Sequence, residues 1–345
     1  MRKKNLRITN DSEKIIEISR RYSVSITPTM MNLIDPKDPK DPIALQFRPD
    51  TKELVEHPED LSDPIGDNRY SPIKGIVHRY PDRVLLTPIN ICPVYCRFCF
   101  RREKVGKTEN AFLTEDQFSR AIDYIQKDQN IWEVILSGGD PLILSPKRLK
   151  KIIGALNSIE HVAVIRIHTR IPIVDPERIS SDLVKSIKSK KAVYIVLHSN
   201  HPRELTASAR LACSKLIDSG IPMLSQTVLL KGINDKPKTL EKLFRQLVAN
   251  RIKPYYLHHM DKAPGTTHFR TSIKEGQEIL KSLRGNISGL CQPNYVLDIP
   301  GGAGKVPIDP TWVKSNDNEF YELMDYQKKK HLYRDHHAKI ESNKI

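Results

Sequence analysis

The sequence predicts an α/β fold built on a parallel sheet, because short β-branched segments alternate with segments of helical period from about residue 83 onward. The strands recur about every 30 residues, which is the length of a βα unit. Six such units form either an open twisted sheet or an incomplete (β/α)6 barrel. Both architectures place ligands at the carboxyl ends of the strands, so functional residues are expected there.

The predicted elements follow one another in a regular order. The six candidate strands are Val84–Ile89, Glu133–Leu136, Val162–Ile167, Ala192–Leu197, Met223–Leu229 and Pro254–Leu257. The helices expected between and after them lie around residues 115–127, 146–157, 178–188, 204–219, 237–249 and 273–283.

Two flanking segments have a different character. Residues 1–75 combine helical periodicity over Lys14–Tyr22 with a proline- and aspartate-rich stretch, Asp35–Pro42, that cannot continue a helix. This pattern predicts a mainly helical or irregular N-terminal arm before a main domain of residues 76–310. Residues 311–345 are strongly charged and amphipathic, which predicts a short C-terminal helical extension or tail.

Composition excludes several classes of protein. The chain has 345 residues, and no uninterrupted apolar run approaches the roughly 20 residues of a membrane-spanning helix. The first residues are basic, but no apolar segment follows them as in a secretory signal, so a cytoplasmic protein is expected. The formal charge of +15 is spread along the chain, with short clusters only at Arg2–Lys4 and Lys328–Lys330. A solvated basic surface is therefore favoured over a nucleic-acid site.

Three of the five cysteines stand close together, as Cys92, Cys96 and Cys99. This Cx3CxxC spacing follows the first predicted strand, and three soft thiolates so close together can face one metal centre. A structural zinc site would usually need a fourth ligand, for example a distant histidine, and three buried thiols without metal are also possible. Three ligands suit a four-iron cluster that leaves one iron open to a small molecule.

A second motif combines glycines with a lysine near the end of the main domain. Gly301, Gly302 and Gly304 surround Lys305, and glycines allow a cofactor to approach the backbone closely. A desolvated lysine can form a Schiff base, which is how pyridoxal phosphate is bound. A nucleotide-phosphate loop is the alternative, but Pro307 follows here instead of the helix that a P-loop requires.

The cysteine spacing, the aromatic Phe98 within it and the Ser137-Gly138-Gly139-Asp140 segment after the next strand resemble the radical S-adenosylmethionine (SAM) superfamily. The resemblance implies an incomplete TIM-like barrel and a [4Fe-4S] cluster held by the three cysteines. It also implies that the open iron binds SAM, that an electron from the cluster cleaves SAM to a 5′-deoxyadenosyl radical, and that Ser137, Gly138, Gly139 and Asp140 contact the methionyl ammonium.

From about Asp41 to Pro310 the chain also resembles the lysine 2,3-aminomutase family. The resemblance rests on residues 78–85, on Arg101 and Arg102 after the cysteines, and on residues 226–235, 254–256 and 298–305. It implies a pyridoxal phosphate (PLP) site at Lys305, Arg79 and Arg83, a substrate site at Arg101, Asp261 and Asp298, and SAM contacts at His198 and Gln226.

The resemblance implies an isomerase that moves the α-amino group of L-lysine to C3, giving β-lysine. The radical takes hydrogen from C3, and hydrogen returns to C2. Two aspartates around the ε-ammonium favour lysine over glutamate, because a γ-carboxylate would be repelled. Supply of (R)-β-lysine for elongation factor P, and a 2,3-aminomutase for another amino acid such as glutamate, remain alternatives.

The basic charge and the remaining cysteines bear on a rival function and on the expected partners. A radical SAM enzyme that modifies RNA is supported by the basic charge, but it would not need the PLP lysine. A reductase, flavodoxin or ferredoxin is expected as electron donor, together with a homo-oligomeric state and no membrane or nucleic-acid partner. Beyond the motif the chain has only Cys213 and Cys291, so no zinc site is expected.

Overall fold

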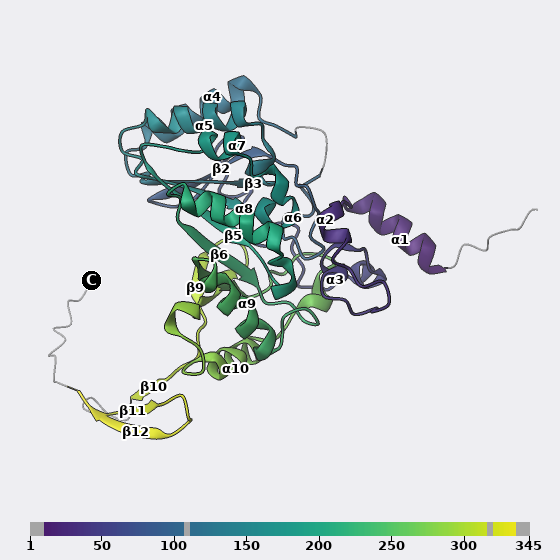
Figure 1. Cartoon of the computed structure of the whole chain (residues 1–345), viewed down its shortest axis with the longest axis vertical. Helices are drawn as coiled ribbons and strands as arrows, with labels where there is room; N and C mark the ends of the chain where they lie inside the picture. The colour runs from purple at the N-terminus through teal and green to yellow at the C-terminus, as the bar shows by residue number, and fades with distance from the viewer. Residues whose placement is uncertain (1–9, 107–110, 316–319, 336–345) are drawn as a thin grey trace, which may run out of the picture.

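In the computed structural model, which describes residues 10–106, 111–315 and 320–335, nine strands form one sheet in the order of the sequence (Figure 1). They are β1 (Ile76–Tyr80), β2 (Arg83–Ile89), β3 (Glu133–Gly138), β4 (Val164–Thr169), β5 (Ala192–His198), β6 (Met223–Val228), β7 (Ile252–His258), β8 (Asn294–Ile299) and β9 (Gly304–Pro307). Strands β2 to β8 are parallel to their neighbours, whereas β1 and β9 pair antiparallel at the two edges. All six predicted strands are confirmed, as β2 to β7.

The sheet curls into a nearly closed barrel. Its two edge strands, β1 and β9, meet through a side chain, because the backbone N–H of Lys305 donates a 2.8 Å hydrogen bond to the Tyr80 hydroxyl. The predicted incomplete barrel is confirmed, with one more parallel strand than expected and an antiparallel strand at each edge.

Helices cover the outside of the barrel between successive strands. The longer ones are α4 (Glu115–Lys127), α5 (Pro146–Asn157), α7 (Ser181–Ser186), α8 (Ala207–Asp218), α9 (Pro237–Ala249) and α10 (Ile273–Leu283), and α6 (Ile171–Val174) is a single turn after β4. Side-chain caps define the N-termini of several of these helices. Thr114 with Gln117 and Ser272 with Glu275 form capping boxes that satisfy the first N–H groups of α4 and α10.

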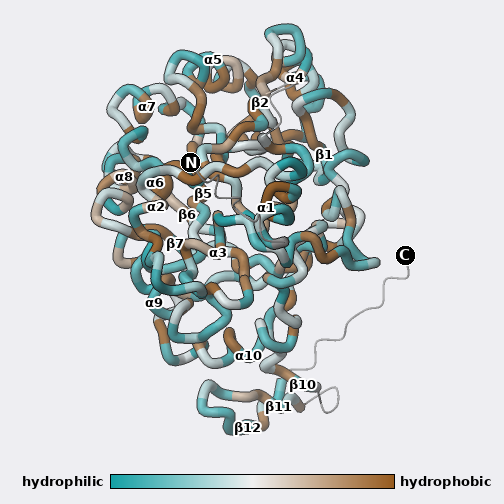
Figure 2. The backbone as a smooth tube through the Cα atoms, turned by 90° about the vertical axis from the view of Figure 1, so that its right-hand side faces the viewer, coloured by the Kyte–Doolittle hydropathy of each residue, from teal (hydrophilic) through white to brown (hydrophobic). Residues whose placement is uncertain are grey.

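The core lies between the sheet and these helices. Residues of the central strands such as Leu136, Ile167, Ile195 and Leu257 are fully buried, and α9 contributes Leu243 from its inward face. Hydrophobic residues gather in the interior of the barrel, and hydrophilic residues are frequent along its outer surface (Figure 2). In the described part of the chain, no helix has the length and apolar character needed to cross a membrane.

An irregular arm precedes the barrel and packs against its loops. It contains α1 (Asn10–Arg21), the short helices α2 (Pro28–Met31) and α3 (Ala44–Phe47), and the 3-10 turn η1 (Thr51–Leu54). Ile18 and Tyr22 anchor the end of α1 because both are almost fully buried. The basic cluster Arg2–Lys4 lies outside the described residues.

The C-terminal segment corrects one prediction. Instead of a helix, its described residues form a separate antiparallel sheet of β10 (Val313–Ser315), β11 (Phe320–Met324) and β12 (Lys330–Arg334), which lies at one end of the molecule (Figures 1 and 2). The reason is a tight turn at residues 325–328, where Lys328 adopts a positive φ of 66° and cannot continue a helix. Residues 336–345 of the predicted tail lie outside the described residues.

Candidate active site

The residues singled out by the sequence lie mainly at one end of the barrel, where the parallel strands have their carboxyl termini. The cysteine loop follows β2, the Ser137–Asp140 turn ends β3, and His168 lies near the end of β4. His198 ends β5 and Gln226 lies in β6, while Asp261 follows β7. Parallel strands bring all these positions to one rim.

The three cysteines of the loop are free thiols with partial exposure. Burial raises the pKa of Cys92 well above its usual range and that of Cys99 to about 11. Thiolates in this environment therefore need a positive centre to stabilise them, as a metal provides. The Cys96 sulfur already accepts a 2.9 Å hydrogen bond from Arg170 Nη1.

The spacing of this thiol set is compatible with an iron–sulfur cluster. Within residues 10–106, 111–315 and 320–335, no three His, Cys, Asp or Glu side chains converge on one metal-ion position. In a four-iron cluster each thiolate binds a different iron, so the three sulfurs need not converge on a point. Cys213 and Cys291 are buried elsewhere in the fold and do not add to the set.

The glycine pair after β3 is packed directly against the start of the cysteine loop. Gly138 has a φ of +105°, and a Cβ on Gly139 would lie only 2.2 Å from the Ile91 carbonyl oxygen. The backbone N–H of Gly139 donates to Ile89 at 2.7 Å, and that of Asp140 donates to Ile91 at 2.9 Å. Only glycines permit this close approach, which locks the turn to the loop.

Asp140 is buried and has protein partners on both oxygens. Oδ1 accepts from the Thr169 hydroxyl at 2.7 Å and from Leu142 N–H at 3.1 Å, while Oδ2 accepts from Arg170 N–H at 2.7 Å. Its carboxylate therefore joins the ends of β3 and β4. The role suggested by the resemblance, a contact to the methionyl ammonium, stays a prediction.

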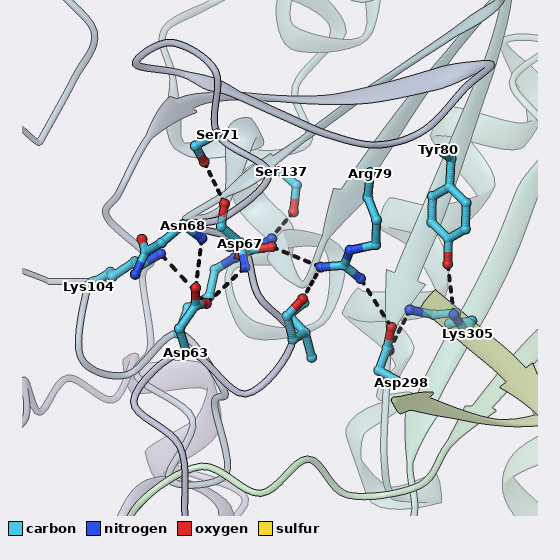
Figure 3. Close-up of polar contacts among 12 residues, drawn as sticks. Asp63, Asp67, Asn68, Ser71, Arg79, Tyr80, Lys104, Ser137, Asp298 and Lys305 are labelled. Atoms are coloured by element: carbon cyan, nitrogen blue, oxygen red, sulfur yellow. Dashed lines mark hydrogen bonds and ion pairs between the residues drawn. The ribbon is translucent and has the colours of Figure 1, made fainter. Parts of the chain in front are cut away.

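A chain of hydrogen bonds and ion pairs joins residues of the arm, the cysteine loop and the barrel strands (Figure 3). It runs from Ser137 through Arg101, Asp67, Arg79 and Asp298 to Lys305. Its closest contacts are Arg101 Nε to Asp67 Oδ2 at 2.7 Å and Lys305 Nζ to Asp298 Oδ2 at 2.5 Å. The structure thus brings together the predicted substrate and PLP residues Arg101, Arg79, Asp298 and Lys305.

Arg79 and Lys305 suit a phosphate-bearing aldehyde cofactor. In the part of the chain that the structure describes, Arg79 Nε is buried without a hydrogen-bond partner, which leaves an N–H donor for an anion. Lys305 lies in β9 opposite Asp298 of β8, so its ammonium is paired and positioned at the pocket. These residues fit PLP.

Arg83 has different partners from Arg79 in this structure. Its guanidinium pairs with Asp82 at 2.5 Å and stacks over the Tyr80 ring at 3.8 Å from the centroid. The Tyr80 hydroxyl in turn accepts the N–H of Lys305, so Arg83 is connected to the site through one aromatic residue. Direct contact of Arg83 with a phosphate stays a prediction.

Gln226 lies among three histidines inside the barrel. Its amide nitrogen donates to His198 and, at 3.4 Å, to His168 Nδ1, and its oxygen is 3.3 Å from His258 Nε2. Burial lowers the pKa of His198 to about 3 and those of His168 and His258 well below their usual range. The cluster is therefore uncharged near neutral pH and suits a ligand surface rather than an ion pair.

Asp261 adds a second carboxylate near Asp298. Burial, and then repulsion from Asp298, raise the pKa of Asp261 to about 7. Two carboxylates that repel each other form a favourable site for an ammonium group, because a cation stabilises both charged forms.

Sequence reasoning assigns no role to four residues of this site. Asp67 lies in the irregular arm, where no strand pattern marks it, and His258 is the residue after the predicted strand Pro254–Leu257 and the last residue of β7. His168 and Arg170 stand after the third predicted strand, but only the fold reveals their partners. The only sequence signal that marks His168 and Arg170 as candidate site residues is their position just after a predicted strand.

Comparison with known proteins gives a consistent result. The radical SAM superfamily model matches residues 86–244, and the family model described as lysine-2,3-aminomutase matches residues 280–341. An L-lysine 2,3-aminomutase of Clostridium subterminale is 40% identical over 94% of this chain and 78% of its own length. An L-lysine 2,3-aminomutase of Methanococcus maripaludis is 44% identical over 93% of this chain and 75% of its own length. A glutamate 2,3-aminomutase of Clostridioides difficile is 37% identical over 92% of this chain and 75% of its own length.

Proposed function

Because this chain belongs to the lysine 2,3-aminomutase family of radical SAM enzymes, we propose that it moves the α-amino group of L-lysine to C3, forming β-lysine. The chain is thus an isomerase that uses a [4Fe-4S] cluster and SAM, and PLP is the further cofactor typical of its family. The observation that carries the choice of substrate is the pair of neighbouring carboxylates, Asp261 and Asp298, whose charges repel each other.

The cofactors have identifiable residues to hold them. Cys92, Cys96 and Cys99 would hold the cluster, while the Ser137–Asp140 turn with His198 and Gln226 would line the SAM pocket. When bound, the cluster supplies the electron that cleaves SAM, and PLP supplies a conjugated ring on the substrate nitrogen. The remaining work belongs to the protein, which orients the ligands and excludes water.

Lys305 has two partners available to its amine. In the structure its ammonium pairs with Asp298, and it is also the residue proposed to bind PLP covalently. Asp298 therefore provides a carboxylate for the lysine amine whenever that amine is charged and free. The same carboxylate can receive the ε-ammonium of the substrate once Lys305 has moved away.

The charges of the pocket support an amino acid with a second ammonium. The Lys305–Asp298 contact of 2.5 Å is itself an ammonium bound to the carboxylate in question. Asp261 is the second acceptor, and Arg101 remains for the α-carboxylate although it is paired with Asp67 in this structure. A γ-carboxylate beside Asp261 and Asp298 would be repelled, which disfavours glutamate.

Partners and location extend the same proposal. The cluster requires a one-electron donor, for which a reductase or a small flavodoxin or ferredoxin is suitable. We also propose a homo-oligomer that works in the cytoplasm on a small-molecule substrate.

The test is an anaerobic assay of the reconstituted holoenzyme with SAM, PLP, dithionite, and L-lysine or L-glutamate offered separately. We expect β-lysine from lysine and no β-glutamate, with Lys305→Ala losing both the visible PLP absorbance and product formation. Lys262→Ala is the matched control, since this exposed lysine pairs with Glu59 on the surface. Turnover of glutamate but not lysine would overturn the substrate assignment and leave the aminomutase chemistry standing.

A further inference from the structure

Arg170 is a buried cation that the proposed reaction does not yet use. It directly follows β4 and is only 6% exposed. Its backbone N–H donates to Asp140 Oδ2 at 2.7 Å, and the hydroxyl of Thr169 donates to the other oxygen of the same carboxylate at 2.7 Å. The turn after β3 thus fixes the backbone from which the Arg170 side chain starts.

The guanidinium of Arg170 lies between a carboxylate and a cysteine sulfur. Nη1 donates to Cys96 Sγ at 2.9 Å, and Nη2 donates to Glu204 Oε2 at 3.0 Å and to Gln46 Oε1 at 2.5 Å. The group also lies over the Phe47 ring, 4.8 Å from its centroid. These contacts come from the arm, the cysteine loop and the segment after β5, so the orientation is set by several elements.

The acidic partner is equally well fixed. Glu204 is fully buried and also accepts hydrogen bonds from the Gln46 side chain at 2.8 Å and from Asn200 N–H at 3.2 Å. Glu204 and Cys96 thus bind different nitrogens of one guanidinium. In this ion pair the guanidinium of Arg170 faces the Cys96 sulfur. The negative charge of Glu204 partly offsets the positive charge of Arg170.

We propose that Arg170 is a positioning residue of the iron–sulfur centre, which fixes the Cys96 sulfur and raises the reduction potential of the cluster. This inference rests on the proposed role of Cys96 as a cluster ligand. Hydrogen bonds to the sulfurs and nearby net charge are among the factors that set cluster potentials. A donor with a permanent positive charge stabilises the reduced form more, because that form carries one more negative charge.

Glu204 is part of the same arrangement and has the opposite effect on charge. As a carboxylate it offsets part of the field of Arg170 at the cluster. Glu204→Gln keeps the size of the side chain but removes its negative charge, so less of the positive charge of Arg170 is offset at the cluster. Arg170→Met and Glu204→Gln should therefore shift the potential in opposite directions, which a merely structural role for both residues would not produce.

The experiment is a potentiometric titration of the reconstituted cluster without SAM, followed by electron paramagnetic resonance, with iron and sulfide content measured on each sample. We expect Arg170→Met to shift the midpoint to more negative values and Glu204→Gln to shift it to less negative values. Arg166→Met is the matched control, because it removes a partly buried ion pair of β4, to Glu133 at 2.9 Å, without touching a cysteine. It should keep the wild-type potential.

A wild-type potential in Arg170→Met with full iron content would overturn the proposal, as would shifts of the same sign in Arg170→Met and Glu204→Gln. If Arg170→Met does not hold a cluster, the midpoint potential of Arg170→Lys is measured instead. Its ammonium cannot reach all the partners of the guanidinium, so its midpoint should be more negative than that of the wild type. An unchanged midpoint in Arg170→Lys would then contradict the proposal.

Failure of this inference is distinguishable from failure of the proposed function. The potential does not depend on which amino acid rearranges, so absence of β-lysine leaves the Arg170 result intact. Conversely, if Cys96→Ala binds as much iron as the wild type, Cys96 is not a ligand and the premise of the inference fails.

Discussion

At the scale of single residues, the pocket is organised by carboxylates that each face more than one cation. Asp67 contacts Arg79 and Arg101, while Asp298 contacts Arg79 and Lys305 and lies 4.0 Å from His258. Most of these side chains are only slightly exposed, so each partner's position depends on the others. A ligand that replaces one cation therefore changes the partners of its neighbours.

Asp261 gives a prediction for pH dependence. Burial and repulsion from Asp298 raise the pKa of Asp261 to about 7, so the carboxyl group gains a proton as the pH falls through 7. Since the ionised form binds an ammonium, the affinity for L-lysine should decrease up to about tenfold per pH unit below that value. Isothermal titration of the anaerobic holoenzyme between pH 6 and 8 measures this dependence.

Asp261→Asn is the control for that titration. It removes the titrating group, so the affinity should be lower by roughly 10- to 100-fold at pH 8 and should vary much less with pH. The same slope in wild type and variant would show that another group titrates, and the substrate role of Asp261 would have to be abandoned.

At the scale of elements, the cysteine loop is held between the turn after β3 and the N-terminal arm. The loop receives backbone hydrogen bonds from the turn at Ile89 and Ile91. From the other side, Tyr95 N–H donates to the Ser25 carbonyl and Arg97 N–H donates to the Gln46 carbonyl. Two independent supports therefore fix the thiols before any cofactor binds.

Gly139→Ala tests the first support. The added Cβ would lie 2.2 Å from the Ile91 oxygen, so the turn and the loop must separate. We expect a decrease of about 1–3 kcal/mol in the free energy of unfolding and at least tenfold weaker SAM binding. Gly154→Ala in α5 is the control, because nothing lies within 4 Å of its Cβ and it should stabilise the helix by up to about 1 kcal/mol. Equal stability of the two variants would contradict this account.

Glu53→Ala tests the second support. Glu53 is almost fully buried and pairs with both Arg97, at 2.5 Å, and Arg102. Its loss leaves two buried guanidinium groups without their carboxylate, so we expect a loss of about 3–5 kcal/mol in urea unfolding. Glu56→Ala removes an exposed pair with Arg21 and should change stability by no more than about 1 kcal/mol. A Glu53→Ala variant as stable as Glu56→Ala would argue against a supporting role for the arm.

The elements that the sequence predicts well are those with clear periodicity. Strands β2 to β7 and helices α4, α5 and α9 follow from alternation and helical period over their own residues. The edge strands β1 and β9 could not be predicted, because they are short and exist through pairing at the ends of the sheet. The prediction of a C-terminal helix was wrong because an amphipathic charged pattern does not reveal the hairpin turn at Lys328.

The residues of the candidate site also divide into those marked by a local sequence motif and those that depend on contacts between distant segments. Cys92, Gly139 and Lys305 stand in motifs that can be read along the chain. Asp67 and Glu204 depend on contacts between distant segments, such as the 2.7 Å pair of Asp67 with Arg101, and no local pattern marks them. Local motifs therefore point to candidate cofactor ligands more readily than to the residues that hold those candidates in place.

At the scale of the whole molecule, the nearly closed barrel brings the residues proposed for the cluster, SAM, PLP and the substrate to one end of its sheet. The thiols and the residues proposed to contact SAM lie in or after the parallel strands, and the lysine proposed to bind PLP lies in the antiparallel strand β9 at the sheet edge. The Lys305–Tyr80 hydrogen bond joins the two edges of the sheet at this lysine. SAM and lysine are therefore expected to react at this one site.

The most direct test follows one hydrogen atom through turnover of the anaerobic holoenzyme with L-lysine deuterated at C3. We predict that mass spectrometry finds deuterium in recovered SAM and at C2 of β-lysine, because the atom passes between substrate and cofactor without reaching water. Formation of β-lysine with the deuterium lost to solvent, or without any label entering SAM, would contradict direct hydrogen transfer between the substrate and SAM at one site.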